Sequence, residues 1–206
     1  VNYLQNQNRL VEAVEVIKEY LGLFSKGESQ FYDSMSQTLK DLTEPSANLW
    51  VSQTFAPASW IRINLNYRNV DRISLRLTRV DPAVIVNRRL SSDEREDIYE
   101  QSFPGETVRE QAVEDIVNEG KHLLRNKQVY LEPLEPGLYQ VSIDAPGVRE
   151  DRNHHQLIRV SGLAVADKHD GLETHVYVAD AESGQPTPDV RVQLLYGHRL
   201  RPMNGG

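Results

Sequence analysis

Six histidines are the side chains of this sequence best suited to moving protons or binding a metal ion. They are His122, His154, His155, His169, His175 and His198. Only His154 and His155 are adjacent, and neighbouring side chains of an extended strand point to opposite faces. We therefore expect ordinary exposed histidines in a linker and no metal site.

Catalytic signatures are missing from the sequence. It has no G-x-S-x-G nucleophile elbow, no H-E-x-x-H pair, no phosphate-binding glycine loop and no dinucleotide fingerprint. It also has no cysteine, which excludes disulfides, thiolate metal sites and cysteine nucleophiles. The sequence thus predicts no catalytic, cofactor-binding or metal-binding residue, and a protein that is not an enzyme.

Carboxylates gather in residues 91–119, where ten acidic side chains face two basic ones. A glycosidase needs a carboxylate pair, but a run of this kind is typical of a solvated face. Calcium sites need a spaced Asp/Asn set with a sharp glycine turn, which this segment lacks. Because unpaired charges are costly to bury, we predict a solvent-facing excursion anchored by Ile98, Tyr99, Val113 and Ile116. Docking of a basic partner on this acidic face is the alternative.

Trp50 and Trp60 are the two tryptophans of the chain. Exposed tryptophans can serve as platforms on which sugar rings stack. At the starts of strands in a β-sandwich, tryptophans more often belong to the core or cover its edge, and this is the expectation here.

Composition indicates a folded protein of one or two domains. The chain has 206 residues, 39% hydrophobic and 26% charged, with a net charge of −7. The negative balance argues against nucleic acid as the main partner, since phosphate binding needs a basic face. No stretch approaches the apolar length of a transmembrane helix, so direct membrane insertion is not expected.

Residues 9–42 have the periodicity of a helical hairpin that must pack on something else. Gly27 separates the two helices, Ser29 is the expected cap of the second helix, and Pro45 stops it. The two apolar stripes are Leu10, Val14, Ile17, Leu21 and Phe24, and then Phe31, Met35, Leu39 and Leu42.

After Pro45 the apolar period changes to two, which predicts half-buried antiparallel strands. The clearest are residues 60–67, 72–80 and 138–143, with Ile63, Leu65, Leu75, Leu77 and Tyr139 in one core. Weaker candidates are residues 49–55, 83–90 and 129–131. Residues 108–117 fit a helix or a strand, and Ser92 looks like a helix start. Further strands are expected at 157–165, 174–178 and 190–196.

Four stretches, in this order, resemble the alpha-2-macroglobulin family in its bacterial form. The first is Asp41–Pro45 at the end of the hairpin. The second is the strand pair Tyr67–Asp71 and Ser74–Asp81, like "y-R-N-v … v-R-l-y-R-v-d". The third is the hairpin Leu131–Tyr139, like "l-p-x-L-x-x-G-x-Y". The fourth is Val176–Val192, like "v-x-V-x-D-x-x-T-G-k-P-x-x-x-a-x-V".

The resemblance implies a string of macroglobulin-like, fibronectin-like β-sandwich domains, and so a mainly β fold. Residues 1–45 would be a helical lead-in, 46–147 one sandwich, 148–156 a linker and 157–206 part of a second sandwich. Three strands are too few for that second sandwich, so we expect the chain to stop inside it.

The family entraps large proteases after cleavage of a bait segment, often with an internal thioester. A thioester needs a cysteine, so no site residue carries over to this chain. The resemblance implies a non-catalytic structural and interaction module of a multidomain envelope protein, in the periplasm or on the surface of a Gram-negative bacterium. Its partners would be other domains of the parent chain, and possible targets would be proteases. The alternatives are a carbohydrate- or adhesin-type binding sandwich and an accessory domain of a larger enzyme.

Overall fold

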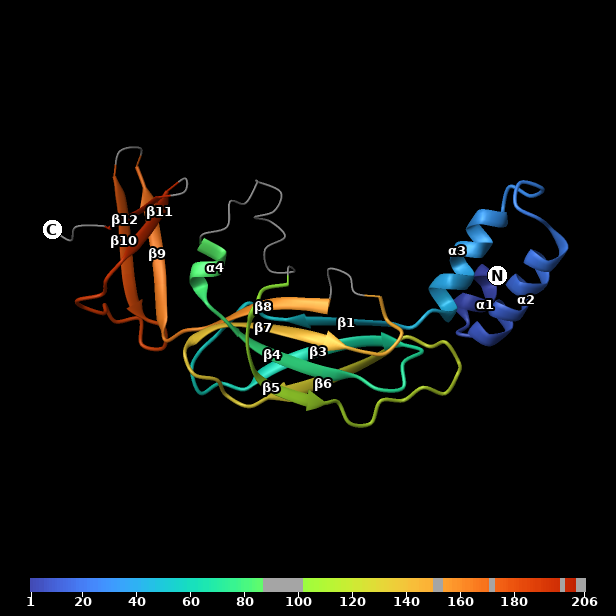
Figure 1. Ribbon diagram of the computed structural model, residues 1–206, viewed down its shortest axis with the longest axis horizontal. Coiled ribbons are helices and arrows are strands. Elements are labelled where there is room, and N and C mark those ends of the chain that lie inside the picture. Colours follow the sequence, from blue (N-terminus) through green and yellow to red (C-terminus); the bar gives the residue numbers. More distant parts are fainter. Residues whose placement is uncertain (87–101, 150–153, 171–172, 197–198, 203–206) are drawn as a thin grey trace.

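The computed structural model describes residues 1–86, 102–149, 154–170, 173–196 and 199–202. The described elements follow one another along the long axis of the molecule, as Figure 1 shows. The first three helices lie at the N-terminal end, two β-sheets and a short helix form the middle, and two β-hairpins lie at the other end. The fold is mainly β, as the period-2 pattern predicts. No helix in the described part of the chain is long and apolar enough to span a membrane.

Three helices form the N-terminal unit: α1 (Asn2–Asn6), α2 (Leu10–Leu23) and α3 (Tyr32–Thr43). The apolar stripes of α2 and α3 face each other, and the sequence pattern predicted this hairpin. α1 was not predicted, and it supplies Leu4 as part of the cover over α2. The buried residues of this unit are Leu10, Ala13, Val14, Ile17 and Leu42.

The ends of the helical hairpin differ from the prediction. Ser29 does not cap α3, which begins after Phe31 and has no side-chain cap. Its hydroxyl accepts a hydrogen bond from the Phe31 N–H within the turn. Phe24 and Phe31 both lie outside the helices and are exposed, so each apolar stripe is one residue shorter than its pattern.

A three-stranded antiparallel sheet forms one layer of the β-sandwich. Its order is β1 (Ser46–Val51), β3 (Ile61–Arg68) and β6 (Arg125–Leu131). Odd-numbered positions of β1 and β3 are buried, and even-numbered positions face outward. Strict alternation follows from the pleat of a strand with one buried face.

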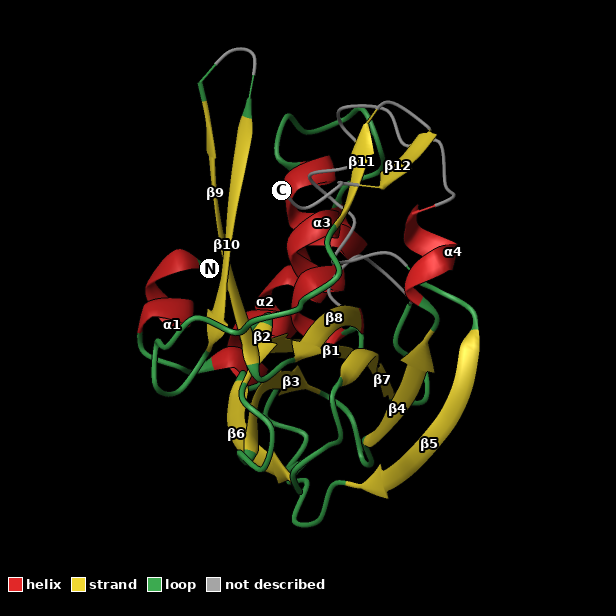
Figure 2. Ribbon diagram, turned by 90° about the vertical axis from the view of Figure 1, so that its left-hand side faces the viewer, coloured by secondary structure: helices red, strands yellow, loops and turns green. Residues whose placement is uncertain are grey.

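The second layer has five strands in the order β2, β8, β7, β4, β5. They are β2 (Thr54–Phe55), β4 (Ser74–Val80), β5 (Gly105–Ala112), β7 (Gly137–Asp144) and β8 (His155–Val160). Only β2 pairs in parallel fashion, with β8. Figure 2 shows how the two layers curve around their shared interior.

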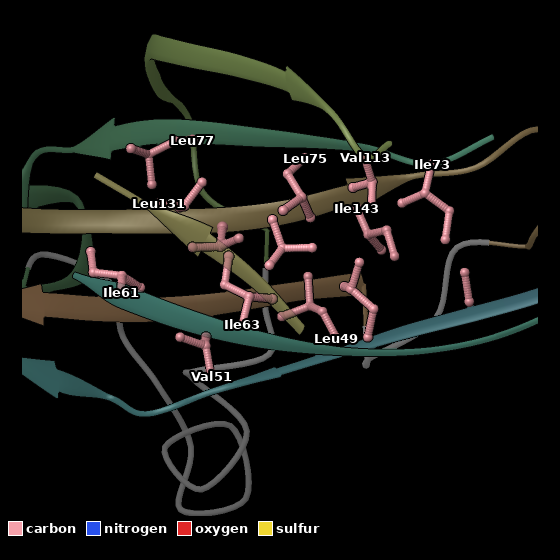
Figure 3. Close-up of a cluster of buried hydrophobic side chains, with 14 of the residues drawn as sticks. Leu49, Val51, Ile61, Ile63, Ile73, Leu75, Leu77, Val113, Leu131 and Ile143 are labelled. Atoms are coloured by element: carbon pink, nitrogen blue, oxygen red, sulfur yellow. The ribbon is translucent and has the colours of Figure 1, made fainter. Parts of the chain in front are cut away.

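The core lies between the two layers, and Figure 3 shows their side chains pointing toward one another. All five predicted core residues, Ile63, Leu65, Leu75, Leu77 and Tyr139, are buried in this one cluster. The register of the clearest strands is therefore confirmed. A slip of one residue would have turned each set to the solvent side.

Several predicted elements differ from the observed ones. Residues 49–55 are not one strand: the chain leaves β1 after Val51 and joins the other sheet as β2. The described part of the 83–90 candidate is helix α4 (Pro82–Val86). The ambiguous segment 108–117 contributes its first part to the edge strand β5. The predicted helix start at Ser92 lies outside the described residues.

The stretch Leu131–Tyr139 is an arch between the two sheets, because β6 and β7 belong to different layers. The Tyr139 hydroxyl donates a hydrogen bond to the Glu135 carbonyl at 2.9 Å, which fastens the arch. The Tyr139 ring lies over Gly137, where a Cβ would come within 3.2 Å of it. The G-x-Y spacing therefore has a local reason: the glycine leaves room for the ring that closes the arch.

β8 connects the sandwich to the C-terminal hairpins. It pairs with β7 and places Ile158 and Val160 in the sandwich core. Residues 157–165 are thus two strands: β8 belongs to the first sandwich, and β9 (Leu163–His169) starts a separate hairpin with β10 (Thr174–Asp180). The sequence pattern could not separate them, because apolar residues recur from Leu157 to Val165 with only short interruptions.

The remaining hairpin consists of β11 (Gln193–Tyr196) and β12 (Arg199–Pro202). The turn after β10 is organised by Asp180, whose carboxylate accepts hydrogen bonds from the N–H groups of Glu182 and Ser183. The backbone and hydroxyl bonds from Ser183 lower the pKa of Asp180. Gly184 adopts a positive φ of 70° there. The D-x-x-S-G part of the fourth motif is therefore a turn.

Candidate functional site

The loop between β3 and β4 joins the helical unit to the sandwich. A helix leaves its last carbonyls without intrahelical partners. The Arg68 guanidinium donates to the Asp41 carbonyl at 2.6 Å, and the Asn69 amide donates to the Leu42 carbonyl at 2.8 Å. Asn69 has a φ of 54°, which an asparagine tolerates better than most residues. The family-like Arg-Asn pair therefore caps the C-terminus of α3 from another element.

His122 completes this junction. Its Nδ1 lies 3.0 Å from the Asn69 side-chain oxygen. Burial, together with the positive charges of Lys18 and Arg68, lowers the pKa of His122 below its usual 6.5. The adjacent Leu123 packs against the core of the helical unit. The junction thus favours neutral His122, and its residues bind protein groups, so it is a structural site.

The acidic segment 91–119 is placed at the surface in its described part. Glu106, Glu110, Glu114, Asp115 and Glu119 are all exposed. Three of these carboxylates pair with cations outside the segment: Glu110 with Arg76, Glu119 with Lys121 and Arg125, and Asp115 with Lys127. These ion pairs explain how the segment can lie along the sandwich despite its excess charge. Exposed pairs contribute little stability each.

Apolar residues hold the same segment to the sandwich. Val113 is buried in the core and Ile116 packs against it, as predicted. Phe103, which was not predicted as an anchor, is buried, and its N–H donates to the buried Gln140 side chain at 3.0 Å. Ile98 and Tyr99 lie outside the described residues.

The structure differs from the prediction at both histidines that were expected in an exposed linker. His154 is buried, so it is not an exposed linker histidine, and His155 is the first residue of β8. His198 lies outside the described residues. Near the end of the β9–β10 hairpin, Asp170, Glu173 and His175 bring their possible ligand atoms within 4.8 Å of one another.

The sequence signal that could have predicted this cluster is the spacing D-x-x-E-x-H, from Asp170 to His175. His175 lies 3.7 Å from Asp170 and 3.6 Å from Glu173. All three side chains are exposed, and the neighbouring residues 171–172 lie outside the described part. Exposed groups of this kind form ion pairs at the surface, and no second observation identifies a metal here.

Both tryptophans contradict the prediction that they belong to the core or its edge. Trp50 is 56% exposed and Trp60 is 60% exposed. Trp50 occupies an even, outward position of β1, and Trp60 directly precedes β3. The strand after Trp60 was predicted to start within one residue of its observed start, but Trp50 lies near the end of β1 and not at a strand start, and the face of each tryptophan was not predicted.

A groove of about 680 Å³ lies where the sandwich meets the C-terminal hairpin. Phe55 and Ala56 form one wall, and Leu163 and Val165 of β9 form the other. Val165 and Leu163 are exposed apolar residues of a two-stranded hairpin. The Ala181 N–H donates to the Gly162 carbonyl at 2.8 Å and holds the base of this hairpin.

Two comparisons based on sequence found no relative: no protein-family model and no curated protein matches the chain. Comparison with solved structures gives matches. A fragment of native alpha-2-macroglobulin from Escherichia coli, spanning its domains MG0, NIE and MG1, matches at 14% identity with a TM-score of 0.53. The match covers 77% of this chain and 54% of that fragment, so the chain spans about half of its length.

Two further matches have lower TM-scores. A shorter fragment of the same Escherichia coli protein, spanning NIE and MG1, matches at 14% identity and a TM-score of 0.47, covering 77% of this chain and 82% of the other. A mutant β-glucosidase from Listeria innocua, solved with laminaribiose, matches at 13% identity and a TM-score of 0.29, covering 57% of this chain and 16% of the enzyme. The latter score supports no functional comparison.

The longer Escherichia coli fragment and this chain therefore share a fold. Their sequence identity of 14% is too low to transfer individual site residues from one protein to the other. The match extends over most of the chain. The chain has the fold of bacterial alpha-2-macroglobulin domains, and the resemblance predicted from its four motifs is confirmed at the level of the fold.

Proposed function

We propose that this chain is a non-catalytic structural and interaction module of a large, extracytoplasmic alpha-2-macroglobulin-like protein. The observation that carries the proposal is the fold shared with domains of the Escherichia coli protein. The parent protein would entrap proteases, in the periplasm or at the surface of a Gram-negative bacterium. This chain would hold neighbouring domains in place and leave the chemistry to other parts of the parent.

The way in which the units of the chain are joined supports a scaffold role. Hydrogen bonds from Arg68 and Asn69 fix the helical unit to one end of the sandwich. At the other end, only Ser161 and Gly162 separate β8 from β9. Short connections of this kind restrict how far consecutive domains can move relative to each other. A module built in this way would hold its neighbouring domains at a fixed relative position.

We place the domain limits by sheet membership. Residues 1–45 are the helical lead-in, 46–160 are the sandwich, and residues from 163 onward start a second β unit. The pairing of β8 with β7 favours a limit after Val160 over the limit at 147 that the family resemblance implies. Limited proteolysis tests this division: cleavage near 161–162 should leave a protected fragment that ends there. Cleavage first within residues 145–149 would favour the earlier limit.

The functional test uses the parent protein and a protease such as trypsin. Entrapment predicts that trypsin mixed with the parent stops cleaving casein but still cleaves a small chromogenic peptide. The chain by itself should hydrolyse neither casein, nor esters, nor glycosides. Equal inhibition of both trypsin substrates, or no inhibition of either, would refute entrapment. Turnover by the chain that a single point mutation abolishes would refute the non-catalytic assignment.

A further inference from the structure

The outward face of the sheet β1–β3–β6 has a composition unlike the rest of this acidic protein. We call it the aromatic–amide face. Strand pairing sets Trp50, Asn64 and Gln128 in one row across the three strands. The neighbouring row sets Arg62 opposite Tyr130. Tyr130 is 52% exposed, close to the value of Trp50, so both rings are open to solvent.

A second amide row lies beside the first. Asn48, Asn66 and Asn126 are paired across the same three strands. Trp60 directly precedes β3 and continues its even-numbered, outward positions. The face therefore carries five carboxamides and three aromatic rings. The outward positions of β1, β3 and β6 carry no carboxylate, although the chain has 30 acidic residues; Glu132, which directly follows β6 near Trp60, pairs with Arg109 of β5.

This composition does not serve the fold. The buried face of the same sheet fills the core, and the outward side chains contribute nothing to it. In Figure 1 the helices α1 to α3 and the C-terminal hairpins lie at the two ends of the sandwich, beyond this sheet. Large aromatic rings exposed together in this way mark a binding surface. A ligand of this face must contact aromatic rings and form hydrogen bonds with carboxamides, without depending on charge.

We propose that the aromatic–amide face binds an extended, uncharged β-linked polysaccharide. The flat faces of its sugar rings carry C–H groups that stack on Trp and Tyr rings, and its hydroxyls both donate and accept hydrogen bonds. Each carboxamide also offers a donor and an acceptor. Strand geometry separates the backbones at Trp50 and Tyr130 by roughly 12 Å, because they flank β3 on adjacent rows. A short run of sugar units spans this distance.

A protein partner fits the face less well. The centres of protein interfaces are rich in aliphatic and aromatic side chains and exclude water. Here no aliphatic side chain occupies an outward position of β1 or β3, and the amides would need individual partners once buried. A charged polymer is also disfavoured, because Arg68 already donates to the Asp41 carbonyl at the end of α3, which leaves Arg62 as the one other charged side chain at the outward positions of these strands, and a single cation does not match a regular polyanion.

The two tryptophans give a direct assay, because they are the only ones in the chain and both belong to this face. Cellohexaose or chitohexaose titrated into the full chain should change the tryptophan fluorescence in a saturable way. Maltohexaose, whose α-linkages curl the chain, should not. Co-sedimentation with insoluble cellulose and chitin provides a second, label-free measurement.

Single variants locate the site. Trp50→Ala and Tyr130→Ala should each weaken binding by about tenfold or more, since such rings dominate the affinity of a surface. Tyr177→Ala, on the exposed β10 hairpin, is the matched control and should bind like the wild type. Circular dichroism checks that the variants fold, which their exposed positions allow.

Three results would overturn the proposal. The first is no binding of either β-linked oligosaccharide by fluorescence or sedimentation. The second is binding that both face variants leave intact. The third is self-association of the chain that Trp50→Ala abolishes, because the face would then be an interface between copies. Failure of protease entrapment in the parent protein would leave these outcomes unchanged.

Discussion

Replacing Asn69 with alanine should destabilise the protein by about 2–3 kcal/mol, and replacing it with glycine by only about 1–2 kcal/mol. This order of destabilisation is unusual, because the glycine variant loses more side-chain atoms than the alanine variant. Two contributions explain it. Both variants lose the amide that donates to the Leu42 carbonyl at 2.8 Å, a bond that contributes about 1 kcal/mol. Only alanine also meets the cost of a positive φ, here 54°, which is about 1 kcal/mol or more.

Chemical denaturation measures this difference if it is followed by two signals. Far-UV circular dichroism reports largely on the helical unit, and tryptophan fluorescence reports on the sandwich, where both tryptophans lie. Asn66→Ala, at an exposed position inside β3, is the control and should stay within about 0.5 kcal/mol of the wild type. Because Asn69 joins the two units, the helical signal should respond at least as strongly as the sandwich signal.

Equal destabilisation of the glycine and alanine variants would refute this prediction, since the left-handed backbone would then carry no cost. Two variants as stable as the wild type would refute it as well. In that case the hydrogen bonds from the β3–β4 loop to the end of α3 would contribute nothing, and another contact would hold the units together.

Further predictions concern the core, the arch and the junction. Leu75→Ala should lower the unfolding free energy by about 2–5 kcal/mol, whereas Val108→Ala on the exposed edge strand should change it by less than about 0.5 kcal/mol; equal effects would contradict the assigned register. Tyr139→Phe should cost about 1 kcal/mol in the same denaturation assay, because the Glu135 carbonyl loses its donor. The pKa of His122 is lowered in the folded state, so the unfolded state binds the proton first and stability should fall as pH drops below about 6.5. His122→Gln should remove that part of the pH dependence, and an unchanged profile by thermal unfolding would refute the assignment.

Local patterns were enough to predict much of the sandwich. Ile63 and Leu65 alternate with polar residues, and this period of two places them on one buried face whatever the neighbouring strand is. The helical stripe from Leu10 to Ile17 follows in the same way from a period near 3.6. The G-x-Y motif and the Asp180 turn are also local, because each forms its contacts within about five residues.

Pairing between distant segments could not be predicted in this way. β8 and β9 follow each other in one largely apolar stretch, and only the hydrogen bonds from β8 to β7 show that β8 closes the first sandwich. The strand breaks after Val51 because β1 and β2 belong to different sheets, and no residue in 49–55 predicts this break. His154 is buried by its surroundings and not by its own sequence context, so its exposure was predicted wrongly.

The sequence by itself determined the type of each clear element, its buried face and the resemblance of four motifs to a family. These depend on periodicity and on turn chemistry, which act over a few residues. The tertiary structure alone decided which strands share a sheet, which loop caps α3, and that Trp50, Tyr130 and the amide rows lie on one open face. Those features join residues far apart in the sequence: Trp50 and Tyr130 are 80 positions apart, and the paired residues Thr54 and Arg159 are 105 apart. Their proximity follows from strand order, which chain-distant hydrogen bonds and core packing establish.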